Sequence, residues 1–169
     1  GKNISAIFQE PMSSLNPLHT VEKQVNEILM IHSSISYMEA TKKTKKLLFQ
    51  VGLENISKRI KAYPHELSGG QRQRVMIAMS IANKPDLLIA DEPTTALDVT
   101  VQSQILDLIQ NIQQQMGMSI LIISHDLAVV KKIADYVCIM KDGEIVEKDT
   151  KDNIFSNPQH SYTKILISS

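Results

Sequence analysis

Residues 87–93 read LLIADEP, an apolar run that ends in two adjacent carboxylates. Consecutive apolar residues fit a β-strand that is buried on both faces, as the strands of parallel sheets are. Ligands of parallel α/β sheets bind beyond the carboxyl ends of the strands. We therefore expect Asp91 and Glu92 at a sheet edge that a ligand can reach.

The two acids can perform different tasks because neighbouring strand residues face opposite ways. Asp91 can hold Mg²⁺, a cation that prefers oxygen ligands and keeps part of its hydration shell. Glu92 can act on a water molecule as a general base, a role worth about 10²–10⁴ in rate. The alternative is a strand followed by a capped turn, with both carboxylates solvated.

The sequence after this strand alternates between helical and extended patterns. It predicts a helix over 99–116 that ends at Gly117, a second buried strand over 120–123, a helix over 126–134, and strands over 136–140 and 144–147 joined by Asp142-Gly143. The order strand, helix, strand, helix, strand implies parallel pairing with right-handed crossovers, with the strand over 136–140 in the same sheet. His125 follows the second strand, so we expect it beside the two acids, where it can donate to a terminal phosphate. Considered alone, His125 is an ordinary loop histidine.

The residues before this strand, from about 18 to 83, carry helical patterns instead. The spacing of Val21, Val25 and Leu29 predicts one helix. A capping box of Ser36 and Glu39 predicts the start of a second helix, with an apolar face of Met38, Leu47, Leu48 and Val51. Its lysines fit either a solvated face or contact with an acidic partner loop: Lys42, Lys43, Lys45 and Lys46. A third helix, from about 69 to 83, places one apolar face on Val75, Ala78, Met79 and Ala82. The C-terminal tail is expected to form one or two short helices packed on the parallel sheet.

The third helix opens with residues 67–71, LSGGQ. The first amides of a helix have no internal partners, and the helix dipole adds about half a positive charge there. Gly69 and Gly70 let the backbone approach a ligand closely, and Ser68 adds a hydroxyl. These features suit a cradle for an anion such as a phosphate group. The alternative is a plain helix start with Ser68 as its cap.

Composition excludes several classes of function. The 18 Lys and Arg residues balance 18 Asp and Glu residues, so no bulk charge attracts nucleic acid or an anionic membrane. No apolar run approaches the roughly 20 residues that a membrane-spanning helix needs. The single cysteine, Cys138, excludes an internal disulfide and fits a reducing compartment. The chain does not begin with methionine, and we expect it to be a fragment of a longer protein.

The order of these segments resembles the ATP-binding cassette (ABC) ATPases, whose signature sequence is LSGGQ. The resemblance runs from Ile4 to about Leu166. It implies that LLIADEP is the Walker B motif, with Asp91 as the Mg²⁺ residue and Glu92 as the catalytic base. It also implies a Q-loop at residues 8–11, in which Gln9 senses metal and nucleotide, and a switch histidine at His125. The implied nucleotide-binding residues are those of the signature and of the D-loop at 96–98: Ser68, Gly69, Gly70, Gln71 and Asp98.

The same resemblance implies an α/β fold: a RecA-like P-loop NTPase core, which is a parallel sheet with flanking helices, plus the ABC helical subdomain. It divides the chain into a Q-loop segment (1–17), a helical signature subdomain (18–84), part of the RecA-like core (85–150) and tail helices (151–169). None of the 6 glycines begins the phosphate-binding pattern GxxxxGK[ST]. We therefore expect the N-terminal β-subdomain and the Walker A loop to be missing. The consequences would be weak ATP binding, or none, and exposed core surface.

Three stretches narrow the resemblance to importers of oligopeptides, dipeptides and nickel: FQEPMSSLNP (8–17), YPHELSGGQ (63–71) and IFSNPQHSYTKIL (154–166). Ser161 departs from this pattern, where the family has proline. The likeness is greatest to peptide-importer ATPases that carry two cassettes in one chain. It implies a subunit that binds ATP and Mg²⁺ and couples ATP hydrolysis to transport.

The implied location is the cytoplasmic face of the bacterial inner membrane, with the protein bound peripherally. The implied partners are a second cassette, facing head to tail, and transmembrane permease subunits. Peptide cargo would be bound by other subunits, and no nucleic acid is expected. Two alternatives stay open: a soluble ABC ATPase without a transport role, and a fragment with no activity of its own.

Overall fold

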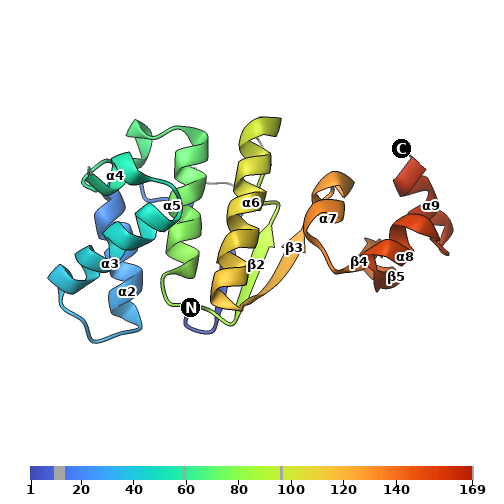
Figure 1. The fold of residues 1–169 in the computed structure, drawn as a ribbon, viewed down its shortest axis with the longest axis horizontal. Helices are drawn as coiled ribbons and strands as arrows, with labels where there is room; N and C mark the ends of the chain where they lie inside the picture. The colour runs from blue at the N-terminus through green and yellow to red at the C-terminus, as the bar shows by residue number, and fades with distance from the viewer. Residues whose placement is uncertain (10–13, 59, 96, 169) are drawn as a thin grey trace. The chain divides into compact units, whose positions relative to one another are not determined.

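The computed structural model describes residues 1–9, 14–58, 60–95 and 97–168 of the chain. The chain forms two compact units, Gly1–Ile123 and Ser124–Ser169. The first unit contains β1 (Ile4–Ile7), α2 (Val21–Ile31), α3 (Tyr37–Gln50), α4 (Glu54–Lys58), the 3₁₀ helix η1 (Pro64–Glu66), α5 (Gly69–Ile81), β2 (Leu87–Asp91), α6 (Val99–Met116) and β3 (Ser119–Ile123) (Figure 1). The second contains α7 (Leu127–Ile133), β4 (Tyr136–Lys141), β5 (Glu144–Thr150), α8 (Lys151–Ser156) and α9 (Ser161–Ser168).

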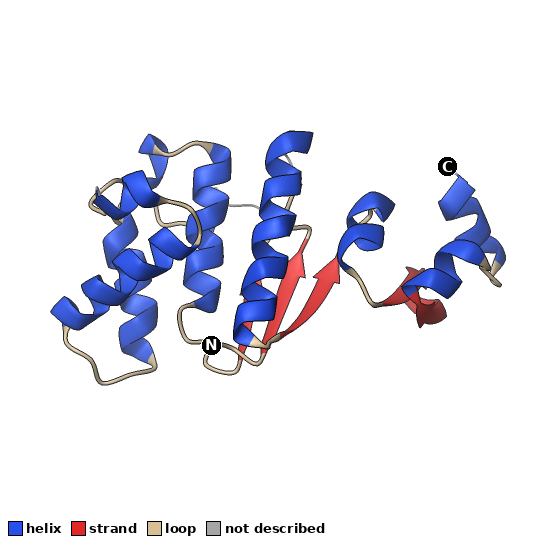
Figure 2. Cartoon of the chain, viewed as in Figure 1, coloured by secondary structure: helices blue, strands red, loops and turns tan. Residues whose placement is uncertain are grey.

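The first unit is built on a parallel sheet with the strand order β1-β2-β3 (Figure 2). Ile7 of β1 is in register with Ala90 of β2, which is in register with Ile122 of β3. Parallel pairing of the two predicted strands is thus confirmed, whereas β1 was not expected from the sequence. The strand that carries the two acids is therefore central among the described strands, and its carboxyl end is flanked on both sides.

One face of this sheet is buried and the other is not. Ile7, Leu88 and Ala90 share the buried face and are 0–1% exposed. On the opposite face, Leu121 is 51% exposed and Ile123 is 48% exposed. The prediction that the strand over 120–123 is buried on both faces is therefore wrong. A short apolar run looks the same in sequence whether one face or both are covered.

Helices α2 to α5 form the helical part of the first unit, with α5 packed against both β1 and α6. The predicted capping box at the start of α3 is confirmed, since Ser36 and Glu39 bond reciprocally. The predicted apolar face of α3 is wrong in one position, because Met38 is 69% exposed. The inward side of α3 instead includes Thr44, whose hydroxyl donates to Asn26 of α2 at 2.6 Å. All the lysines of the basic run are exposed.

Helix α5 was expected to bury one face, but it is surrounded. Its buried residues lie all around the helix: Gln73, Val75, Met76, Ile77, Ala78, Ser80 and Ile81. It is thus the central helix of the first unit, between the sheet on one side and the other helices on the other. The helix that begins with the signature sequence is therefore packed on several sides rather than projecting from the surface.

The described residues of the second unit form an antiparallel hairpin and three short helices, α7, α8 and α9. Strands β4 and β5 pair with each other, and the turn between them has positive φ at Asp142 (51°) and Gly143 (85°). The hairpin prediction is confirmed. The prediction that β4 extends the parallel sheet is wrong, because this tight turn gives β4 its partner in β5. The tail helices pack within this unit, around a core of Val137, Ile139 and Ile154.

The division into four functional segments expected from the sequence stays a prediction. Within the described residues, none of the helices combines the length and the apolar character that crossing a membrane requires.

Candidate functional site

The chain bends sharply at the carboxyl end of β2. Asp91 is the last residue of the strand and is half-buried, and Glu92 follows it with a φ of 44°. A positive φ costs a non-glycine residue about 1–3 kcal/mol unless its surroundings enforce it. Here the amide of Glu92 donates to the carbonyl of Ile123 at 2.9 Å, which ties the bend to β3. The bend ends the strand and leaves Glu92 at the sheet edge.

Two side chains in the described part of the chain donate to the carboxylate of Glu92. The side-chain amide Nε2 of Gln9 lies 2.9 Å from Glu92 Oε2, and the hydroxyl of Thr95 lies 2.8 Å from the same oxygen. Gln9 follows β1, so two residues separated by 83 positions meet at one edge of the sheet. Gln9 and Glu92 were expected from the sequence, whereas Thr95 was not. The sequence signal for Thr95 was a hydroxyl three residues after Glu92, a spacing at which a side chain can bond back to the first residue of a turn.

A divalent cation would find few protein ligands at this edge. No three His, Cys, Asp or Glu side chains of the described ranges gather closely enough to hold a metal ion. Mg²⁺ is commonly bound by one or two carboxylates together with substrate phosphates and water. The Asp91 carboxylate and the side-chain oxygen of Gln9 fit that mode of binding, in which the nucleotide supplies further ligands.

The signature sequence forms a capping box at the start of α5. The hydroxyl of Ser68 accepts from the amide of Gln71 at 3.3 Å, and Gln71 Oε1 accepts from the amide of Ser68 at 3.0 Å. The simple alternative, a helix start with Ser68 as its cap, is therefore present in this chain. The amides of Gly69 and Gly70 find no acceptor among the described residues. These two amides are the donors that a bound anion could use.

The two glycines of the signature have different surroundings. A Cβ on Gly70 would lie 2.9 Å from Cγ1 of Val101, closer than packed side chains allow, whereas one on Gly69 would lie 3.8 Å from Cδ2 of Leu97. Gly70 is thus required by the close approach of α5 to α6, and Gly69 has room. The start of α5 therefore lies beside residues 97–101. Asp98, in this segment, uses its carboxylate to cap α6 through the amide of Val101 at 3.0 Å.

A buried glutamine joins α5 to the turn after Glu92. Gln73 is 1% exposed, and its Nε2 donates to the carbonyl of Pro93 at 2.6 Å. Gln73 was not expected from the sequence to be part of the site. The only signal was its place within the helix that begins at the signature. The helix and the turn that carries Glu92 are thus directly bonded.

The comparisons with known proteins agree with this geometry. A family model described as "ABC transporter" matches residues 1–95. The chain belongs to the ABC transporter family. The resemblance noted in the sequence is thereby confirmed.

Two solved ABC ATPases share this fold. CbiO1 from Clostridium perfringens, part of the ABC transporter complex cbiONQ, has a TM-score of 0.80 and 29% identity, over 92% of this chain and 60% of that one. The ATP-binding cassette MJ0796, in a dimeric post-hydrolysis state with ADP and phosphate, has a TM-score of 0.76 and 30% identity, over 89% of this chain and 63% of that one. The expected RecA-like ABC fold, a parallel sheet with flanking helices, is thus confirmed.

Curated ABC relatives of this chain are named as transport proteins. The peptidoglycan transport ATP-binding protein YejF of Agrobacterium fabrum is 61% identical over 99% of this chain, which spans 31% of that protein. The oligopeptide transport ATP-binding protein OppD of Bacillus subtilis is 53% identical over the whole chain, which spans 47% of that protein. The chain therefore spans about half, or less, of the length of these relatives.

His125, the residue expected to be the ABC switch histidine, lies in the second unit and is exposed. Its loop is shaped by its neighbours. The amide of Asp126 donates to the Ser124 hydroxyl at 3.0 Å, and the Asp126 carboxylate caps α7 by accepting from the amide of Ala128 at 2.8 Å. The expectation that His125 stands beside Glu92 stays a prediction.

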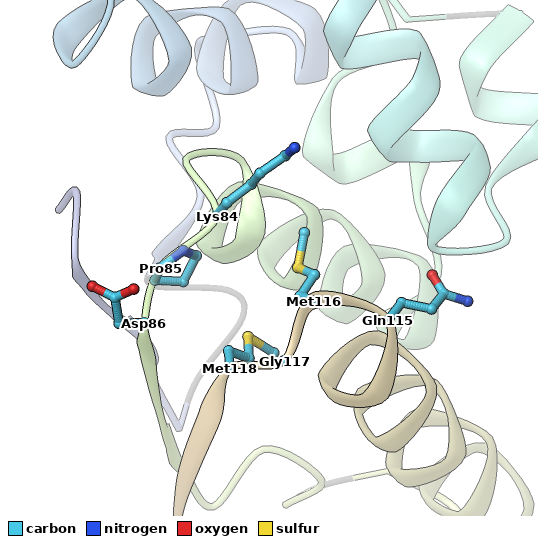
Figure 3. A pocket seen from close by; sticks show the side chains of 7 residues that line it. All are labelled: Lys84, Pro85, Asp86, Gln115, Met116, Gly117 and Met118. Carbon is cyan, nitrogen blue, oxygen red and sulfur yellow. The ribbon is translucent and has the colours of Figure 1, made fainter.

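Two hollows lie elsewhere in the ABC fold of the first unit. One, of about 230 Å³, lies at the amino ends of β2 and β3. Figure 3 shows that its lining comes from the loop before β2, the end of α6 and the two residues before β3: Lys84, Pro85, Asp86, Gln115, Met116, Gly117 and Met118. Ligands of parallel sheets bind at the opposite, carboxyl ends. This hollow is therefore not the nucleotide site. The other, of about 280 Å³, is lined in part by Phe8, Ile28, Ile31, Met76 and Met79.

Proposed function

We propose that the protein containing this chain is the ATP-hydrolysing subunit of an ABC importer for oligopeptides or dipeptides. The observation that carries the proposal is the carboxylate of Glu92, held by Gln9 and Thr95 at the carboxyl end of β2. The relatives YejF and OppD are named as transport proteins for peptidoglycan and for oligopeptides, which supports a peptide-type cargo. We assign the recognition of that cargo to other subunits of the importer.

Glu92 acts as the general base in this proposal. A base must be aimed at the proton that it removes. The two donors to Oε2 fix the carboxylate, and the Glu92 amide bond to Ile123 fixes its backbone. His125 would donate to the terminal phosphate from the loop after β3.

Asp91 and the side-chain oxygen of Gln9 would hold Mg²⁺ beside the ATP phosphates. When bound, this ion neutralises the charge of the phosphate oxygens. Gln9 would then have two contacts, since its Nε2 donates to Glu92 while its oxygen faces the ion. The Gln9 side chain would thereby contact both the ion at the nucleotide and the proposed base, Glu92.

The signature sequence would bind the nucleotide of a second cassette, arranged head to tail. The start of α5 lies against residues 97–101, while Gln73, further along the helix, reaches the turn after β2. The start of α5 and the residue that contacts the turn after β2 are therefore different parts of the helix. This separation supports a start of α5 that points towards the neighbouring cassette. The amides of Gly69 and Gly70 would donate to its γ-phosphate, with Ser68, Gln71 and Asp98 forming the rim.

The second hollow, which Phe8 helps to line, would bind the permease. Phe8 is 61% exposed and Ile31 is 72% exposed, and both line it. Exposed apolar side chains around a recess are typical of an interaction site. Because Phe8 precedes Gln9, an apolar permease segment docked here would act on the contact between Gln9 and Glu92. The protein would accordingly work peripherally at the cytoplasmic face of the membrane.

The base assignment is tested with Glu92→Gln in the full-length protein. We expect ATP binding to persist, measured with a fluorescent nucleotide, and phosphate release to fall at least about 100-fold. Glu144→Gln, an exposed acid on β5, is the matched control and should leave phosphate release unchanged. Normal turnover by Glu92→Gln would contradict the proposal.

The transport role is tested separately with Phe8→Asp. Placing a charge in the apolar hollow should abolish co-purification of the full-length protein with its permease subunits, while ATP binding persists. Leu18→Asp, at a loop position that is 82% exposed, is the control. Undiminished co-purification of Phe8→Asp would favour a soluble ABC ATPase or another docking surface.

A further inference from the structure

Gln73 occupies a position where a polar side chain is costly. It is 1% exposed, within a helix whose other buried residues are mostly apolar. Burying a side-chain amide is unfavourable unless its hydrogen bonds are made. The bond from Nε2 to the carbonyl of Pro93 meets that need at 2.6 Å. An apolar residue would fill this space without requiring a partner, so the bond itself is the feature to explain.

The acceptor of this bond lies inside the turn that carries Glu92. Pro93 follows Glu92 directly and has no backbone N–H, so its carbonyl is its only backbone polar group. Two bonds close the turn from within: Thr95 donates its amide to the Glu92 carbonyl at 3.1 Å and its hydroxyl to the Glu92 carboxylate at 2.8 Å. Gln73 adds a bond from a different element.

The bond from Gln73 to Pro93 helps to hold the strained backbone at Glu92. A residue with a φ of 44° keeps this conformation only when its surroundings over-determine it. The bonds from Thr95 move with the turn, whereas the bond from Gln73 fixes the turn to α5. The bond from the Glu92 amide to Ile123 fixes the start of the turn to β3, and the bond from Gln73 fixes Pro93 to α5. The direction of the Glu92 carboxylate therefore depends on where α5 lies as well as on β3.

The signature sequence lies at the start of α5, one turn before Gln73. Gln73 follows Gly70 by three residues, about 4.5 Å along the helix axis. At Gly70 the helix is already in close contact with α6, since a Cβ there would lie 2.9 Å from Val101. Between the signature and Gln73 there is one continuous, well-packed turn of helix, which transmits a displacement rather than absorbing it.

We propose that Gln73 is a positioning residue that couples the nucleotide contact at the signature to the general base of the same chain. When the start of α5 engages a phosphate, the Gln73–Pro93 bond carries the shift into the turn and aims Glu92. This inference rests on the proposed function, because it takes Glu92 as the base. It predicts that each cassette activates its own base when it engages its neighbour's nucleotide.

The test uses Gln73→Met in the full-length protein, which keeps the length of the side chain and removes the donor. We expect kcat for ATP hydrolysis to fall about 10- to 100-fold, the range for a misplaced catalytic group, with KM for ATP changed less than about twofold. Amide hydrogen exchange at Thr95 should rise while exchange within α5 is unchanged. Arg74→Met is the matched control, because Arg74 donates to the carbonyl of Val51, away from the turn. It should lower the melting temperature and leave kcat near its original value.

Coupling itself is tested by combining substitutions. If Gln73 passes on the signature contact, the effects of Ser68→Ala and Gln73→Met on kcat should be clearly less than additive. Ser68→Ala with Arg74→Met should be additive. If Gln73→Met fails to fold, Gln73→Asn is measured instead, since it is one methylene too short to reach Pro93.

Two results would overturn this inference: a kcat that is unchanged despite a lower melting temperature, or strict additivity with Ser68→Ala. Either would leave the proposed function standing, provided that Glu92→Gln is inactive. Conversely, if Glu92→Gln hydrolyses ATP normally, the proposed function itself is contradicted.

Discussion

The side-chain amide of Gln9 lies 2.9 Å from the carboxylate oxygen Oε2 of Glu92. The residue that follows β1 is thereby bonded to the residue that follows β2, and the two strands are neighbours in the sheet. Gln9 is exposed. A contact between Glu92, the proposed base, and an exposed residue can be made or broken without unfolding the core.

Gln9→Leu should therefore affect turnover more than stability. It removes one of the two donors to Glu92 Oε2 and leaves the bond from Thr95. We expect the full-length protein to lose about 10-fold in kcat, with a free energy of unfolding lowered by no more than about 1–2 kcal/mol. Steady-state hydrolysis and urea unfolding measure the two quantities. Gln114→Leu on the exposed side of α6 is the control, and equal kcat values for both variants would contradict the role of Gln9.

The two signature glycines should respond differently to alanine. Gly70→Ala puts a Cβ 2.9 Å from Val101 Cγ1, and such overpacking costs about 1–3 kcal/mol, more than the roughly 1 kcal/mol that alanine gains in a helix. Gly69→Ala meets Leu97 at 3.8 Å and should not destabilise the fold. Urea unfolding of the 169-residue chain measures both.

Adding Val101→Ala to Gly70→Ala supplies the control, because it removes the methyl that the new Cβ meets. The double variant should recover most of the loss relative to Val101→Ala alone. If Gly70→Ala proves as stable as the unchanged chain, the requirement for glycine at 70 would come from the nucleotide alone.

Local signals predicted the ends of elements well. The capping box of Ser36 and Glu39 begins α3, Gly117 ends α6 with a φ of 66°, and Asp142-Gly143 forms the turn of the hairpin. Each of these depends on side chains or backbone angles within a few residues. Such local signals can be recognised in the sequence whatever the rest of the fold is.

Features that depend on distant partners were not readable in the same way. The four residues of β1 become a strand only by pairing with β2, more than 80 positions later, and the open face of β3 depends on what covers it. In the site, Glu92 was found from its place at the end of an apolar run, whereas Gln9 was found only through the family resemblance. Thr95 and Gln73 were missed because their roles exist only in contacts with the turn after β2.

The open face of the sheet should make the isolated chain self-associate. Ile4 is 54% exposed and Leu121 is 51% exposed, and both lie on this face. Burying apolar surface is worth about 25 cal/mol per Å², so contact between two such faces is favourable. Sedimentation velocity at tens of micromolar should show species larger than the monomer.

Leu121→Thr should reduce this association, since threonine keeps a high β-propensity and removes apolar surface. Leu18→Thr, in a loop outside the sheet and 82% exposed, is the matched control. An equal decrease for both variants, or none for Leu121→Thr, would show that the sheet face is not the contact.

In the second unit, Glu147 of β5 holds the segment that leads into α9. Its carboxylate accepts from the amide of Gln159 at 2.7 Å and from the amide of His160 at 3.0 Å. The backbone amide of Gln159 is the main reason that the pKa of Glu147 lies below its ordinary value. The ionised form is thus favoured when the segment is docked.

A lowered pKa in the folded state means that Glu147 stabilises docking at pH values above its unfolded pKa, about 4.3, and that this contribution is lost as pH falls through the lower folded pKa. Glu147→Gln should therefore speed amide exchange at Gln159 and His160 at neutral pH, and should flatten the loss of protection below about pH 4.3. Exchange measured by mass spectrometry from pH 7 to pH 3, corrected for the intrinsic rate, tests this. Glu144→Gln on the same strand is the control, because no bond joins that carboxylate to the segment among the described residues. If Glu147→Gln and the unchanged chain lose protection along the same pH curve, the segment is held by the packing of α9 and not by this carboxylate.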